Sequence, residues 1–190
     1  MLNDESSAMA ERPSFQKFSP HQIETVNNSV AMAEELVSDY YKMSASEWLH
    51  PKYDVKTLAD LTPAEIAQGP FAQVIRYVGY RNDRSLGSQA YDFYKICLQD
   101  HAILSAVQSS QELTLYPFCL YIVAHELIHI VRFSKFLQNF DASPEEKLQE
   151  ETRVHELTHH ILSGIRVKGL MAVFDFYSRW REPIEGLQNP

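Results

Sequence analysis

Five of the eight histidines lie between residues 125 and 160, and four of them form two matching H-E-x-x-H spacings, at 125–129 and 155–159. On a helix, positions i and i+4 point from the same face, so each histidine pair can bind one metal ion with the glutamate beside it. The candidate metal ligands are His125, His129, His155 and His159, and the candidate catalytic carboxylates are Glu126 and Glu156.

The surroundings of the first pair favour a ligand role over a packing role. His125 and His129 stand among aliphatic and aromatic residues in the most apolar part of the chain. Imidazoles on the apolar stripe of a core helix are costly unless they are hydrogen-bonded or ligated. The alternative is that these are core histidines satisfied by hydrogen bonds. The doubled spacing makes that alternative the less favoured one.

The spacing of the motifs predicts an antiparallel helical hairpin, with helices over about 115–140 and 144–163. Ser143, Pro144 and Glu146 form an N-cap, a first-turn proline and a capping box for the second helix. If the chain turns at Ala142, facing residues have numbers that sum to about 284. This register pairs 125 with 159 and 129 with 155, and the short loop limits a slip to about one turn.

Three further residues near the second motif are assigned by the same geometry. Glu151 lies on one helical stripe with the histidines at 155 and 159, which indicates a ligand or a partner of a ligand. Glu150 is expected to be solvated. His160 lies about 100° around the helix from its neighbour at 159 and is expected at the surface or behind the ligands.

The rest of the chain reads mostly as helix, which predicts a mainly α fold, a single-domain helical bundle. Proline and apolar spacing predict a helix from residue 20, and others are expected over 88–107 and 167–180. Segment 48–60 is read as a loop, and 71–80 suits a strand as well as a helix. Residues 1–19 are expected to be a flexible leader, 20–181 the metal-binding domain, and 182–190 a flexible tail.

Composition and charge limit the kinds of partner that the protein can bind. A net charge of −8 argues against a nucleic-acid partner held through phosphates, and 45% hydrophobic with 22% charged residues is ordinary globular composition. The apolar run at 113–124 is shorter than the roughly 18 residues that a membrane span needs. Cys97 and Cys119 are expected to be buried thiols. These features predict a cytoplasmic protein with no membrane span, whose partners are a metal ion and an unknown substrate.

The segment from Ile122 to Ile130 resembles the active-site helix of gluzincin-type zinc metallopeptidases. The resemblance implies that His125 and His129 bind zinc, that Glu126 activates water, and that a third ligand comes from a later helix. Glu151 stands 22 residues beyond His129, at a separation that suits the third ligand in that family, and His155 is the alternative. The likeness covers about 35 residues. Such peptidases also need an edge strand for the substrate, and the sequence upstream of residue 115 gives no clear one.

With the second motif included, the sequence also resembles the paired E-x-x-H motifs of ferritin-like di-iron and di-manganese bundles. There Glu126-x-x-His129 and Glu156-x-x-His159 would form the pair. The missing carboxylates would come from Glu34, Glu35, Asp92 or Asp100.

The sequence therefore favours a zinc-dependent hydrolase of the metallopeptidase type. The rivals are a helical dinuclear oxidoreductase, with iron or manganese in place of zinc, and a non-catalytic protein whose hairpin is stapled by metal. Imidazole suits zinc and iron alike, so ligand type does not separate these functions.

Overall fold

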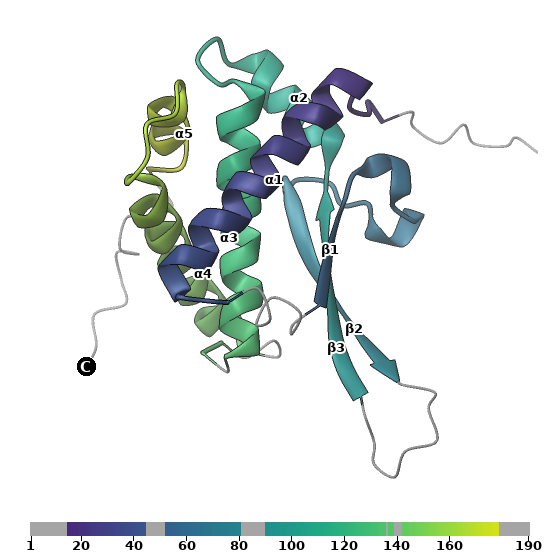
Figure 1. The fold of residues 1–190 in the computed structure, drawn as a ribbon. Helices are drawn as coiled ribbons and strands as arrows, with labels where there is room; N and C mark the ends of the chain where they lie inside the picture. Colours follow the sequence, from purple (N-terminus) through teal and green to yellow (C-terminus); the bar gives the residue numbers. More distant parts are fainter. Residues whose placement is uncertain (1–14, 45–51, 81–89, 136, 139–141, 179–190) are drawn as a thin grey trace, which may run out of the picture.

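The computed structural model describes residues 15–44, 52–80, 90–135, 137–138 and 142–178. It combines five helices with a three-stranded mixed sheet (Figure 1). The prediction of a mainly α helical bundle is therefore wrong, and the fold is a helix-rich mixture of α and β structure. Residues 1–14 and 182–190 of the expected leader and tail lie outside the described residues. The elements in chain order are α1 (Pro20–Tyr41), β1 (Lys52–Lys56), β2 (Ala72–Tyr80), β3 (Ala90–Leu98), α2 (Asp100–Ser109), α3 (Leu115–Ser134), α4 (Pro144–Leu162) and α5 (Leu170–Phe176), with short 3-10 turns at Leu58–Asp60 and Pro63–Glu65.

The sheet has the order β1-β3-β2, with β1 parallel and β2 antiparallel to the central strand. Most of the helix expected over 88–107 is divided between β3 and α2. Tyr94, Ile96 and Leu98 are all buried and share one face of β3, which is the period-2 pattern of a strand. Short apolar runs fit a strand or a helix equally well in sequence, and here pairing with two neighbouring strands decides for the strand.

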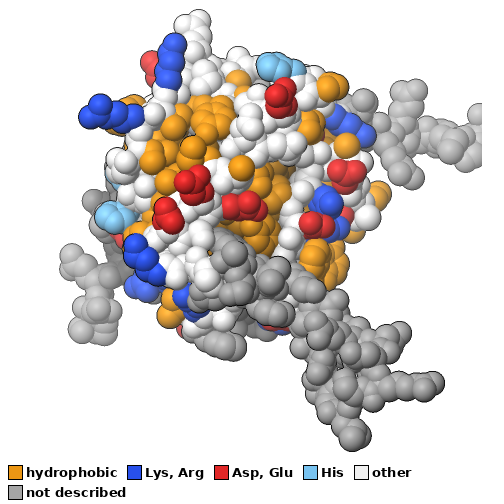
Figure 2. Space-filling model, viewed as in Figure 1, with side chains coloured by type: hydrophobic (Ala, Val, Ile, Leu, Met, Phe, Trp, Pro, Cys, Tyr) orange, Lys and Arg blue, Asp and Glu red, His pale blue; other side chains and the backbone are white. Residues whose placement is uncertain are grey.

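Helix α3 is the centre of the molecule. Most of its residues are buried, with α1 against one side and the sheet against another. By length and hydropathy alone α3 is a candidate membrane span, but 83% of the relevant window is buried inside the protein. Acidic side chains lie among apolar ones on the face that carries α1, as the net charge of −8 leads one to expect (Figure 2).

The hairpin of α3 and α4 differs from the predicted one in its turn. Helix α3 ends at Ser134, six residues before the expected end, and the backbone N–H of Leu137 bonds to the carbonyl of Arg132. The start of α4 is as predicted: Ser143 caps the helix and forms a capping box with Glu146. The centre of the hairpin therefore moves toward α3, which shifts the register of the two helices.

Candidate metal centre

Three side chains from α3 and α4 bring donor atoms to one point. The Nε2 atoms of His125 and His129 lie 3.1 Å apart. The two carboxylate oxygens of Glu151 lie 3.2 Å from Nε2 of His125 and 3.1 Å from Nε2 of His129. Tetrahedral zinc with ligands at about 2.0–2.1 Å places its donor atoms about 3.3–3.4 Å apart. The two imidazole nitrogens therefore lie about as far apart as neighbouring zinc ligands, and each lies at a similar distance from a different oxygen of the Glu151 carboxylate.

A side chain behind one of these donors holds the ring of His129 in a suitable orientation, whereas Nδ1 of His125 is buried without a hydrogen-bond partner among the described residues. Nδ1 of His129 lies 3.1 Å from Oε1 of Gln138, and a carbonyl oxygen can only accept, so Nδ1 carries the hydrogen. The lone pair of His129 then lies on Nε2, where a metal would bind it. Such a partner on the second ring nitrogen is usual for metal-bound histidine.

Charge and burial act together on these groups. Burial lowers the pKa of His129, but the hydrogen bond and charge of Glu151 outweigh it and raise that pKa to about 8. Burial alone would raise the pKa of Glu151, while His125 and His129 hold it well below its usual range. Glu151 and His129 thus each favour the charged form of the other.

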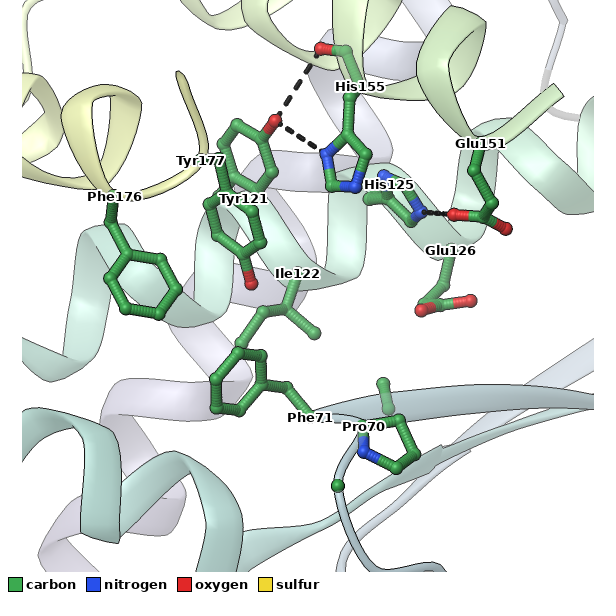
Figure 3. Close-up of a pocket in the computed structure, with 12 residues that line it drawn as sticks. Pro70, Phe71, Tyr121, Ile122, His125, Glu126, Glu151, His155, Phe176 and Tyr177 are labelled. Carbon is green, nitrogen blue, oxygen red and sulfur yellow. Dashed lines mark hydrogen bonds and ion pairs between the residues drawn. The ribbon is translucent and has the colours of Figure 1, made fainter. Parts of the chain in front are cut away.

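His155 lies on the margin of this group. Its ligand atom, with those of His125 and Glu151, belongs to a set within 4.8 Å of one another, the one such His/Cys/Asp/Glu set found among the described residues. A hydrogen bond of 3.0 Å joins its Nδ1 to the hydroxyl of Tyr121 (Figure 3). His155 is thus close enough to contact the metal or a molecule bound to it, and in that set it stands in place of His129.

The second motif is not brought to the site as a unit. The residue numbers of predicted facing pairs sum to 284. In the structure His125 contacts His155, with ring centroids 4.3 Å apart, and their numbers sum to 280. The shift of about one turn follows from the early end of α3 and carries His159 past the site. His159 instead packs on Phe174, with ring centroids 4.3 Å apart, and Glu156 is exposed.

The structure also gives the positions of Glu150 and His160, the two residues that flank the second motif. Glu150, expected to be solvated, is mostly buried and forms an ion pair with Arg132, including a bond of 3.1 Å from Nη2 to Oε2. The expectation for Glu150 is therefore wrong. His160 is exposed and packs edge-on against Tyr40, which agrees with its expected surface position.

Glu126 lies beside the donor group. It follows His125 on α3 and lines the hollow space on both sides of the donor group. Burial raises the pKa of Glu126, and the neighbouring histidines oppose that rise. Figure 3 shows its carboxylate directed into the cleft and apart from the ion pair of His125 with Glu151.

The carboxylates that a dinuclear site would need have other roles or positions. Glu34 bonds the hydroxyl of Tyr53, Asp92 pairs with an arginine of the sheet, and Asp100 accepts two backbone N–H groups. Glu35 is exposed. The described residues therefore offer one compact donor group and not two.

The outer strand β2 runs beside the donor group. The backbone N–H of Gln99 bonds the carbonyl of Phe71, so the odd-numbered residues from 71 onward direct their backbone groups toward β3. The N–H and C=O groups of Ala72 and Val74 then point away from the sheet, and both residues line the hollow that contains His125 and Glu126. The edge strand that the sequence did not reveal thus lies next to the candidate site.

Comparison with protein-family models, with curated proteins and with solved structures finds no match for this chain. The interpretation of the site therefore depends on its own geometry. Gln138, Tyr121 and the edge of β2 are the parts that sequence reasoning missed. Only the strand had a detectable signal, in the aromatic and β-branched run after Pro70.

Proposed function

We propose that the protein is a zinc-dependent metallopeptidase in which His125, His129 and Glu151 hold the metal and Glu126 is the general base. The observation that carries this proposal is the donor group: the Nε2 atoms of His125 and His129 lie 3.1 Å apart, and each lies 3.1–3.2 Å from one of the two carboxylate oxygens of Glu151. Three protein ligands leave a fourth position free, which is the arrangement of catalytic rather than structural zinc sites.

The residues around the metal would divide the work of hydrolysis. When bound, zinc supplies Lewis-acid polarisation of a carbonyl and lowers the pKa of water. The carboxylate of Glu126 takes a proton from the attacking water and delivers it to the leaving amine nitrogen, and its raised pKa suits both transfers. His155, whose ring is fixed by Tyr121, faces the cleft and hydrogen-bonds the substrate.

A peptide is favoured as substrate because the outer edge of β2 pairs with no other strand among the described residues. The outward backbone groups of Ala72 and Val74 can pair with an extended chain, the usual way in which a sheet edge binds a peptide. A strand added there passes between β2 and the donor group on α3. Its backbone carbonyls would then pass the metal at a height fixed by hydrogen bonds.

The rival functions receive less support. A dinuclear oxidoreductase needs more carboxylates at the site than Glu126 and Glu151. A metal staple needs four protein ligands. The fourth donor near the group is His155, whose Nδ1 is hydrogen-bonded to Tyr121, and His159 packs elsewhere. No observation favours either of them over the peptidase.

Glu126→Gln tests the proposal with Glu156→Gln as its control. Both changes remove one charge from an H-E-x-x-H motif, but Glu156 is exposed and away from the donors. Glu126→Gln should keep wild-type zinc content and lose about 10²–10⁴-fold in hydrolysis of casein-derived peptides. Glu156→Gln should keep both. Equal activity in the two variants, or a zinc-loaded wild type that cleaves nothing, would overturn the proposal.

A further inference from the structure

A second pocket lies where α4 ends and α5 begins, and none of its described lining residues belongs to the proposed metal site. It has a volume of about 600 Å³, within the range of about 300–1,000 Å³ that is usual for small-molecule sites. We refer to it as the α4–α5 pocket; its lining includes His159, Arg166, Lys168, Leu170, Met171 and Phe174. His159, the histidine of the second motif that the metal site does not use, is therefore part of another hollow.

The floor of the α4–α5 pocket is apolar. Leu170 and Phe174 stand four residues apart on α5, so they share one face of that helix, and both are buried. Ile165 and Val167 pack against the hydrophobic core beside them. The ring of His159 packs on Phe174 and continues this surface. Such a floor can bury an alkyl chain.

The rim of the pocket carries two cations without acidic partners. Arg166 and Lys168 are both exposed, and neither forms an ion pair with any described residue. No acidic side chain is among the described residues that line the pocket, although the net charge of the protein is −8. Figure 2 shows basic side chains beside an apolar area at the end of the molecule that carries α5 in Figure 1. Cations beside an apolar floor complement an anion that has an apolar part.

The segment that carries these cations is held in place by the fold. Gly169 has a φ of 85°, and a Cβ there would lie 2.9 Å from Oγ1 of Thr114, so the segment lies directly against the start of α3. The backbone N–H of Leu170 bonds the carbonyl of Val167 and closes the turn after the second cation. The backbone therefore needs little ordering when a ligand binds, which favours affinity.

We propose that the α4–α5 pocket binds a single-chain amphiphile with an anionic head, either a carboxylate or a phosphate. The head would contact Arg166 and Lys168, and the alkyl chain would lie on Leu170, Met171 and Phe174. A membrane surface is the less favoured partner, because two cations are fewer than the clusters of about 4–8 that bind anionic lipid surfaces, and the net charge of −8 opposes adsorption. This binding site does not depend on the peptidase function proposed above.

The direct test is calorimetric titration of the chelator-treated full chain with decanoate and with decyl phosphate below their micelle concentrations. Binding of either anion at one molecule per chain supports the proposal, and the ratio of the two Kd values identifies the preferred head. Octanoate should bind at least about threefold more weakly than decanoate, because two fewer methylenes are buried. Absence of binding by both decyl anions would overturn the proposal.

Three further ligands separate this site from less specific binding. Decyltrimethylammonium, which has the same chain and the opposite charge, should not bind. Inorganic phosphate should bind at least about tenfold more weakly than decyl phosphate, because it buries no alkyl chain. Equal Kd values in either comparison would contradict the proposal. Cosedimentation with phosphatidylglycerol vesicles, without binding of the monomeric amphiphiles, would assign the surface to a membrane and overturn it as well.

Two double variants locate the anionic head. Arg166→Gln with Lys168→Gln should raise the Kd for the decyl anions at least about fivefold. The control is Lys17→Gln with Arg153→Gln, which removes the same charge from exposed positions outside the pocket and should leave the Kd unchanged. An equal effect of the two double variants would mean that only net charge matters, and no effect of the first would place the head elsewhere.

Three single variants locate the alkyl chain. Met171 is 69% exposed and lines the pocket, whereas Leu148 is 44% exposed and does not. Met171→Ala should raise the Kd at least about twofold, and Leu148→Ala should not. Glu126→Gln should bind the decyl anions as the wild type does. Weaker binding by Glu126→Gln would place the amphiphile at the metal site and overturn this inference, while the peptidase proposal would stand.

Discussion

His129 and Glu151 form an ion pair at the centre of the molecule when no metal lies between them. Nε2 of His129 is 3.1 Å from Oε1 of Glu151, and the histidine side chain is only 7% exposed. Burial opposes the charged ring, but Glu151 outweighs it and raises the pKa of His129 from 6.5 to about 8. The folded protein thus binds this proton more tightly than the unfolded chain does.

The free energy of unfolding of the metal-free protein should therefore fall as pH rises. A raised folded-state pKa contributes stability in full below the unfolded value of 6.5, and that contribution disappears as pH passes about 8. The shift is about 1.5 units, the difference between those two values, and each unit corresponds to about 1.4 kcal/mol. We expect a loss of about 2 kcal/mol between about pH 6 and pH 8.5.

Urea unfolding of chelator-treated protein at the two pH values measures this loss. Glu151→Gln removes the group that raises the pKa of His129, so this variant should lose most of the pH dependence, whereas Glu156→Gln should keep it. Saturating zinc should reverse the trend, because a metal can bind His129 only after its proton leaves. A metal-free wild type whose stability is flat or rises over this range would refute the assigned contact.

Three other perturbations follow from the same geometry. His129→Ala should abolish zinc binding by elemental analysis and remove the stabilisation that zinc provides, whereas His159→Ala should retain near wild-type metal; loss of metal in both would mean that the second motif takes part. Val74→Pro removes a backbone N–H that faces the cleft and not β3, so it should raise KM for peptides at least about tenfold while changing urea stability little, and an unchanged KM would contradict strand addition. Arg132→Met leaves Glu150 buried without a partner and should cost about 3–5 kcal/mol in urea unfolding, whereas the double change with Glu150→Leu should cost clearly less; equal losses would contradict a coupled pair.

The hairpin shows what the sequence could and could not specify. The capping box of Ser143 and Glu146 fixed the start of α4, because its chemistry is local to three residues. The end of α3 has no such signal: the apolar pattern continues past Ser134, where the helix stops. An uncertainty of six residues in one boundary displaced the facing register by a turn. It therefore left His155 beside the site and moved His159 away from it, whereas both had been predicted as ligands.

The sheet was missed for a different reason. The sequence of β3 does not alternate clearly between apolar and polar residues, because both faces of the strand carry buried residues, such as Ile96 and Cys97. What makes it a strand is pairing with β1 and β2, and the β1 partners lie 41 residues away in sequence, as in the pair of Lys56 with Cys97. The donors themselves were predictable because the i, i+4 rule acts within one helix. The hydrogen bonds of Gln138 and Tyr121 to the histidine rings were not predictable, because they depend on the register of the hairpin.

Zinc anomalous diffraction from crystals of the zinc-loaded full chain would locate the metal. We expect one peak within about 2.0–2.2 Å of Nε2 of His125, Nε2 of His129 and a carboxylate oxygen of Glu151. Glu126 should lie beside that peak without bonding to it. A peak coordinated by four protein side chains, two peaks that share Glu126, or a peak centred on His159 would contradict a mononuclear site that is open for hydrolysis.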